Sequence, residues 1–235
     1  TASNNVAVGN NSLASNTTGA NNTALGAESL DTNTEGANNV AVGYIALGAN
    51  TTGICNVAIG SCALLSNISG SENTAVGMNA ARLTTGGANV AVGHSALEDN
   101  TSGASNTALG REALHTNTTA SNNVAVGKRA LYLNQTGATN TAVGQNSLLS
   151  NTTASDNTAV GAASLYANTT GVGNTAIGRQ ALVANLTANS NVAIGKEALC
   201  TNTTGPNNTA IGNTALSKNT TAAGNTAVGF VSMRC

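Results

Sequence analysis

The segment from Val40 to Asn56 reads VAVGYIALGANTTGICN, and this 17-residue pattern returns along the whole chain. Its opening tetrapeptide, VAVG or TAVG with Ile or Leu as variants in third place, starts at Val6, Thr23, Val40, Val57, Thr74, Val90, Thr107, Val124, Thr141, Thr158, Thr175, Val192, Thr209 and Thr226. Every interval is 17 residues except the one from Thr74 to Val90, which is 16. There, TTGG (Thr84–Gly87) stands where NTTG is expected, so we read an Asn as missing. The sequence predicts a single repeat domain over residues 1–235, with 13 full units from Val6 and a partial C-terminal unit.

Aligning the units defines 17 columns, with the Val or Thr of the tetrapeptide as column 1. Column 2 is always Ala, column 3 is Val, Ile or Leu, column 4 is always Gly, and column 7 is Ala or Ser. Column 8 is Leu except at Ala81 and Met233, columns 11 to 14 read NTTG or NTTA with variants, and column 17 is always Asn. All Lys and Arg, and every acid except Glu35, fall in columns 5, 6, 9, 10 and 16. This segregation indicates that columns 1 to 4, 7 and 8 are buried and that the variable columns face solvent.

The period of 17 residues is too short for paired-helix repeats and is not a multiple of a heptad. Two extended pieces joined by turns fit it better. Columns 1 to 3 form the first piece, with column 2 on one face and columns 1 and 3 on the other. Gly in column 4 permits a positive φ at a corner, and columns 7 to 9 form a second extended piece with Leu inward. The NTTG segment then turns the chain, with Asn bonding its own backbone and Gly relaxing φ.

Antiparallel hairpins are the alternative arrangement, and they would favour Asn-Gly or Asp-Gly turns. Neither dipeptide occurs in the chain. We therefore predict an all-β fold, a parallel β-solenoid of about fourteen coils, with ladders of Asn side chains in columns 11 and 17. The predicted structural core comprises Ala7, Val8, Gly9, Leu13, Ala41, Val42, Gly43, Leu47, Ala125, Val126, Gly127 and Leu131.

Both faces of the first extended piece carry small or apolar residues, and one thin coil cannot easily bury both. An oligomer with strand faces packed on a common axis would bury the second face. More than half of the residues are Ala, Asn, Thr or Gly, 7% are charged and the net charge is −1. This composition gives no basic footprint for nucleic acid and no polybasic membrane patch. Neither a membrane-spanning apolar run nor a signal peptide is present, so we expect no membrane insertion and a mature, excised or non-secretory chain.

Four cysteines, Cys55, Cys62, Cys200 and Cys235, form no metal-ligand spacing. Free or buried thiols are the simpler interpretation, and interchain disulfides are the alternative, with Cys235 and then Cys200 as candidates. Eleven NTT-type turns contain the N-x-[ST] sequence. They make Asn16, Asn50, Asn117, Asn151 and Asn202 candidate glycosylation sites. Turn and ladder hydrogen bonds explain the same Asn and Thr residues without any glycan.

His94 and His115 stand in variable columns, where a surface position is the simplest expectation. No catalytic or nucleotide-binding motif occurs, and the variable columns change residue from coil to coil, so no set of polar groups converges. We therefore expect no enzyme activity, no catalytic residues, no cofactor and no metal. Regular rows of Thr raise an ice- or glycan-binding module as an alternative. However, the paired Thr of columns 12 and 13 fall in a turn, and column 1 alternates with Val.

The N-V-A-V-G, N-V-A-I-G and N-T-A-V-G segments resemble the S-V-A-I-G motif of YadA-like trimeric autotransporter adhesin heads. They are equally similar to the N-T-A-V-G arrays of phage tail-fibre-like and bacterial surface proteins. The resemblance spans essentially the whole chain, and residues such as Ala7, Val8 and Gly9 carry it. It implies a left-handed parallel β-roll, three chains around one axis and an extracellular role in attachment. The units of adhesin heads are shorter, and the extra residues here lie in the NTTG turn.

The leading hypothesis is a structural or adhesive fibre segment, non-enzymatic and homotrimeric, located outside the cell, on a cell surface or on a virion. Variable columns 5, 6, 9 and 10 would contact any cell-surface receptor or glycan. The alternative is a subunit of a helical extracellular filament that polymerises end to end through open coil edges.

Overall fold

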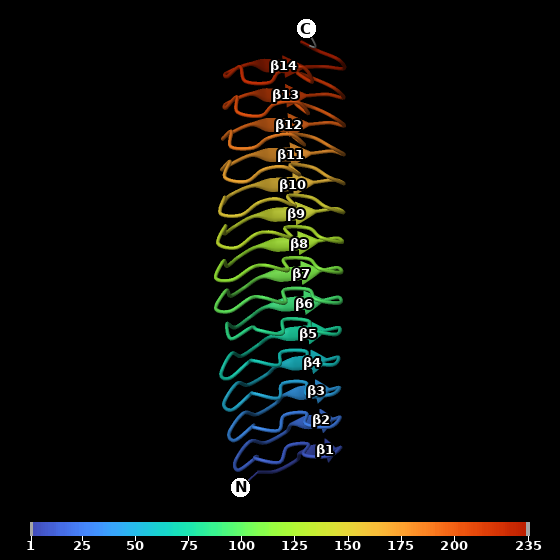
Figure 1. Cartoon of the computed structure of the whole chain (residues 1–235), viewed down its shortest axis with the longest axis vertical. Helices are drawn as coiled ribbons and strands as arrows, with labels where there is room; N and C mark the ends of the chain where they lie inside the picture. The colour runs from blue at the N-terminus through green and yellow to red at the C-terminus, as the bar shows by residue number, and fades with distance from the viewer. Residues whose placement is uncertain (1, 234–235) are drawn as a thin grey trace. The chain divides into compact units, whose positions relative to one another are not determined.

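The computed structural model describes residues 2–233, in which strands and turns alternate and no helix occurs. Its contacts divide the chain into two compact units, one ending at Thr119 and one beginning at Ala120. Each unit is a parallel β-solenoid with one short strand per coil, so the predicted solenoid with 17-residue spacing is confirmed. Within each unit the strands stack one above another in chain order (Figure 1).

The first unit contains β1 (Val6–Val8), β2 (Thr23–Leu25), β3 (Val40–Val42), β4 (Val57–Ile59), β5 (Thr74–Val76), β6 (Val90–Val92) and β7 (Thr107–Leu109). The second contains β8 (Val124–Val126), β9 (Thr141–Val143), β10 (Thr158–Val160), β11 (Thr175–Ile177), β12 (Val192–Ile194), β13 (Thr209–Ile211) and β14 (Thr226–Val228). Paired strands match column to column, as Ala24 with Ala41 and Ala159 with Ala176 show. The in-register pairing explains why the columns are so uniform, because each residue lies beside its own counterpart.

Small residues and Leu fill the interior of each coil. Ala41, Leu47, Ala125 and Leu131 are fully buried, and Leu13 is 9% exposed. Columns 2, 7 and 8 therefore point inward, and the thin interior explains why Ala recurs in column 2. The other predicted core residues of the first coil, Ala7, Val8 and Gly9, are exposed, because that coil has a neighbouring coil on one side only.

The aliphatic residues of column 3 do not belong to this interior, which corrects our expectation for Val42 and Val126. Both are only half-buried, while Ala41 and Ala125 beside them are fully buried. Successive residues of a strand point to opposite faces, so an inward column 2 turns columns 1 and 3 outward. The strand therefore contributes only its Ala to the core of the coil.

The expected second extended piece at columns 7 to 9 is wrong, because the chain forms turns there. The Leu of column 8 adopts a left-handed backbone conformation, with φ of 51° at Leu47 and 52° at Leu131. Columns 6 and 16 adopt the same conformation, as at Ile45 (φ 54°) and Asn38 (φ 59°). Left-handed conformations turn the chain sharply, and these residues bend the coil around its buried Leu.

Gly in column 4 has the positive φ that the sequence predicts. At Gly43 φ is 132°, and a Cβ atom there would lie 2.7 Å from the carbonyl carbon of Gly60 in the next coil. Both the backbone angle and the close approach of the next coil therefore require glycine. The glycines of column 14, such as Gly36, do not adopt the left-handed conformation that we expected of them.

Two ladders of Asn side chains run along each unit, as predicted. In column 17, Asn39 N–H donates to Asn22 Oδ1 at 3.0 Å, and Asn39 Nδ2 donates to Gly53 O at 2.8 Å. In column 11, Asn50 Nδ2 donates to Asn33 Oδ1 at 2.8 Å and, within its own turn, to Gly53 O at 3.1 Å. These side chains are fully buried. The ladders therefore satisfy polar groups of the turns that backbone pairing leaves open.

The 16-residue coil still has a residue in column 11, the position of the Asn ladder. This corrects our interpretation that the Asn of this coil is the missing residue. Thr84 N–H donates to Ala81 O at 3.0 Å, as Asn67 N–H does to Leu64 O at 3.2 Å, and Thr84 is fully buried. Thr84 thus occupies column 11. The deletion falls in the turn that follows.

The left-handed backbone of column 6 predicts that two reciprocal substitutions in the second unit change its stability in opposite directions. Thr214 has φ of 54° and Asn146 has φ of 56°. A β-branched residue is disfavoured in this conformation, whereas Asn tolerates it. Thr214→Asn should raise the stability by about 1 kcal/mol, and Asn146→Thr should lower it by about the same amount. Thermal unfolding midpoints of both variants check this, and midpoints that move in the same direction would contradict it.

Candidate interaction surface

The outer face of the strands presents an apolar surface in each unit. Columns 1 and 3 point out of the coil, and the exposed fractions include 47% for Leu25, 40% for Ile59, 39% for Ile177 and 38% for Ile211. We call columns 1 and 3 the sheet face; its column 3 residues are Val8, Leu25, Val42, Ile59, Val76, Val92, Leu109, Val126, Val143, Val160, Ile177, Ile194, Ile211 and Val228. Contiguous exposed aliphatic side chains typically mark an interaction surface.

No charged residue occurs in columns 1 or 3. Column 1 carries Val or Thr, which both suit a pleated, half-buried surface. Since parallel pairing repeats each column at the strand spacing of about 4.8 Å, the sheet face of each unit is a regular array of methyl groups with some hydroxyls. Such an array is suited to packing against another flat surface and offers no group for acid–base chemistry.

The candidate glycosylation residues lie in the column 11 ladder. Asn50, Asn117, Asn151 and Asn202 are fully buried, and Asn16 in the first coil is half-buried. The amide nitrogen of Asn151, for example, donates to Asn134 Oδ1 at 2.7 Å and to Ala154 O at 2.9 Å. A glycan would have to be attached to this same nitrogen before folding, and it would then prevent the ladder from forming.

The threonines of column 12 use their hydroxyl groups within the fold. Thr17 Oγ1 donates to Thr34 O at 2.9 Å, and Thr169 Oγ1 donates to Leu186 O at 3.0 Å. Each of these hydroxyls joins one coil to the next. The column 12 threonines therefore serve the stacking of coils.

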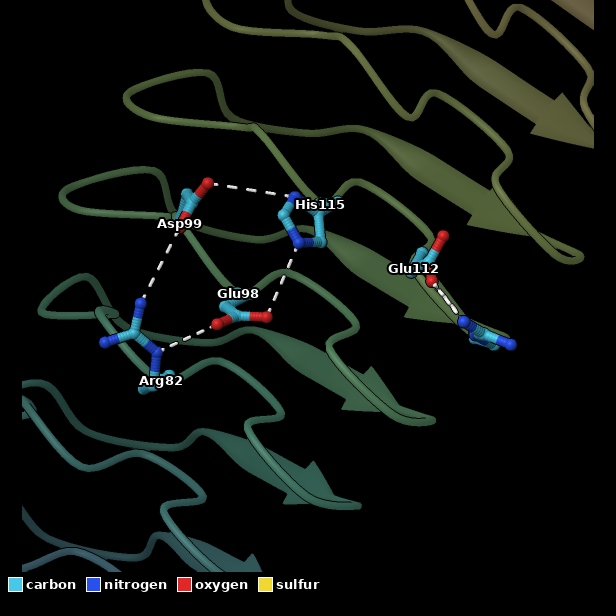
Figure 2. Close-up of polar contacts among 6 residues, drawn as sticks. Arg82, Glu98, Asp99, Glu112 and His115 are labelled. Atoms are coloured by element: carbon cyan, nitrogen blue, oxygen red, sulfur yellow. Dashed lines mark hydrogen bonds and ion pairs between the residues drawn. The ribbon is translucent and has the colours of Figure 1, made fainter.

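A cluster of charged side chains lies on successive coils of the first unit, away from the strands (Figure 2). Arg82 Nε lies 2.9 Å from Glu98 Oε1, and His115 Nε2 lies 3.4 Å from Glu98 Oε2. Asp99 also belongs to the cluster. Its Oδ1 lies 4.0 Å from Arg82 Nη2, and its Oδ2 lies 3.7 Å from His115 Nδ1. Sequence reasoning placed His115 on the surface and missed this cluster. The available signal was that Arg82, Glu98 and His115 share column 9 of three consecutive units.

Glu98 is the titrating group that this cluster changes most clearly. Partial burial raises its pKa, but hydrogen bonds from Ser95 and Arg82 and the charges of Arg82 and His115 lower it more, so the net pKa is below the ordinary value of 4.5. A separate pair joins Arg111 to the buried Glu112 at 2.9 Å. These ion pairs join side chains of the same coil or of adjacent coils.

The cysteines with described positions are free thiols: Cys55 is exposed, and Cys62 and Cys200 are half-buried. Burial, with the nearby Glu197 carboxylate, raises the pKa of the Cys200 thiol, which disfavours the reactive thiolate. The predicted interchain disulfide at Cys235 lies outside the described residues, and that at Cys200 stays a prediction. His94 is exposed.

Over residues 2–233, no group of three or more His, Cys, Asp and Glu side chains is arranged to hold a metal ion. In the same range, no helix is long and apolar enough to cross a membrane. A hollow of about 290 Å³ in the second unit lies at its last described coil, between Leu216 and Met233, with Lys218 as the charged residue in its lining.

No protein-family model, curated protein or solved structure matches this chain. The resemblance to trimeric adhesin heads and tail-fibre-like arrays therefore stays a hypothesis that rests on the repeat itself.

The column 11 ladder predicts a large loss of stability when one amide is removed. Asn50→Ala leaves the buried Asn33 Oδ1 without its donor and removes one acceptor of the buried Asn67 Nδ2, while Gly53 O keeps its hydrogen bond from Asn39 Nδ2. At about 1–3 kcal/mol for each unsatisfied buried group, the variant should lose about 3 kcal/mol or more. Thermal unfolding measures this, with Asn213→Ala as the control, because Asn213 is exposed. Equal melting points for the two variants would contradict the role of the ladder.

The charged cluster predicts a stability difference that depends on pH. Because the pKa of Glu98 is lowered by folding, its ionised form stabilises the fold above about pH 4.5, and this contribution disappears as the pH falls through the lowered pKa. The Glu98→Gln variant should therefore have a lower melting temperature than the parent at pH 7, and this difference in melting temperature should disappear toward pH 3. The exposed Glu72 provides the matched control, Glu72→Gln. A gap that is constant over this pH range would exclude the assignment.

Proposed function

We propose that this chain is a structural, non-enzymatic segment of an extracellular fibre on a cell surface or virion, built from three parallel copies that pack their sheet faces toward a common axis. The observation that supports it is the sheet face. Each unit keeps Val, Ile or Leu in column 3 of every coil, and these side chains are half-buried or exposed in the single chain. Three such faces around one axis would remove them from water.

Symmetry supplies a second argument for parallel, in-register copies. In such an assembly each sheet-face residue meets the same residue of its neighbours, so that a charge would face an identical charge. The absence of any charge in columns 1 and 3 fits this requirement, while columns 5, 6, 9 and 10 carry charges of both signs. Those variable columns would face outward and contact a receptor or glycan. The left-handed coil belongs to the proposal through the family resemblance alone.

The proposal predicts a discrete mass in solution that depends on the sheet face. Multi-angle light scattering should give three times the chain mass of 22.8 kDa. The double variant Ile177→Asp with Ile211→Asp should dissociate to monomers, because each substitution would place three like charges at the axis. Both side chains already point outward, at 39% and 38% exposure, so the coil itself should fold.

Leu186→Asp is the matched control, since Leu186 is 42% exposed but lies in the NTT-type turn of the same unit. It should keep the trimeric mass. A monomeric parent chain, or a face variant that stays trimeric, would overturn the proposal. An open-ended series of masses in the parent chain would favour the end-to-end filament instead.

A further inference from the structure

The turn ladder of the first unit is interrupted where the full-length coil that begins with β4 meets the 16-residue coil that begins with β5. In most other coils a column 12 carbonyl accepts two or more backbone N–H groups from the preceding coil. Thr34 and Glu35 donate to Thr51 O at 3.1 and 3.0 Å, for example. Ile68 and Ser69 are the equivalent donors at the short coil, and among the described residues no carbonyl accepts from them. The missing residue therefore removes the backbone bonds of one turn.

The side-chain ladder is interrupted at the same place. Asn67 Oδ1 is buried and has no hydrogen-bond partner, although Asn67 Nδ2 donates to Asn50 Oδ1 and Gly70 O. The residue above it is Thr84, whose hydroxyl accepts from Asn100 Nδ2 at 3.3 Å. The Thr84 hydroxyl makes no hydrogen bond to Asn67 Oδ1. Thr84 thus continues the ladder toward Asn100 but leaves Asn67 Oδ1 unsatisfied.

The rest of this junction is intact. Strands β4 and β5 pair in full register. The column 17 ladder also continues, since Asn73 N–H donates to Asn56 Oδ1 and Asn89 N–H donates to Asn73 Oδ1, both at 3.0 Å. The weakness is therefore confined to the turn, while the strand side of both coils stays bonded.

We propose that the turn Ile68–Gly70 is a built-in local opening point of the first unit, which detaches from the short coil while β4 and β5 stay paired. Segments with few hydrogen bonds and high exposure open at low free energy without global unfolding. Ile68 and Ser69 are exposed, and Ile68 O is the acceptor for Thr51 and Thr52 N–H of the coil below. Opening the turn releases these two bonds. The inference is independent of the proposed fibre function.

Native-state hydrogen exchange of the parent chain tests this opening. Thr51 and Thr52 N–H depend on the Ile68 carbonyl, whereas Thr34 and Glu35 N–H make the same bonds one coil earlier to Thr51 O. Two absent hydrogen bonds at about fivefold each predict exchange at Thr51 and Thr52 roughly 25-fold faster than at Thr34 and Glu35. Equal rates for the two pairs, after correction for intrinsic exchange, would overturn the proposal.

Two variants separate the missing residue from the missing amide. Insertion of one Thr after Thr85 restores the 17-residue length and should slow exchange at Thr51 and Thr52 to the rates of Thr34 and Glu35. Thr84→Asn gives Asn67 Oδ1 a donor but leaves the coil short, so it should raise the melting temperature and keep the fast exchange. Fast exchange that persists in a folded insertion variant would refute the proposal. If the insertion variant does not fold, the comparison within the parent chain decides.

Discussion

Each coil of a unit must stack on a near-copy of itself at the strand spacing of about 4.8 Å, and Asn in column 17 makes this stacking continuous. Asn39 illustrates the bond pattern: its backbone N–H donates to the Asn22 side chain, its carbonyl accepts from Thr23 N–H, and its own side chain accepts from Asn56 N–H. One residue type thus ties three coils together at the start of every strand. No other side chain has an amide in the right place, which is why this column does not vary.

The stacking requirement determines what the other columns hold. An interior only one coil thick has room for Ala41 and Leu47 but for little else, and the backbone of Leu47 bends into a left-handed conformation to close around that interior. Left-handed Leu is unfavourable by roughly 1–2 kcal/mol. Burial of the side chain at about 1.5–3 kcal/mol and the bond from Leu47 N–H to Ala63 O offset this cost in each coil. The fold therefore accepts local strain in exchange for a closed, fully bonded coil.

The sequence predicts the period, the parallel register, the Gly corner and both Asn ladders, because each depends on a residue type with one outstanding property. It does not predict the backbone at Leu47, since Leu has no intrinsic preference for a left-handed conformation and only the closed coil imposes it. The orientation of Val42 is equally hidden, because alternation along a strand shows that two faces exist but not which one is inside. The cluster at Glu98 required knowledge that column 9 side chains of adjacent coils touch.

The inward turn of Ala41 has a consequence for association. Because Ala, Leu and Asn fill the core of the coil, the column 3 side chains contribute no fully buried residue to it. Yet column 3 stays Val, Ile or Leu in all fourteen repeats, while columns 5 and 9 change freely. The proposed trimer would account for this difference, because three packed sheet faces need a flat, uncharged and regularly spaced partner. A further copy of the same sheet face has these properties by construction.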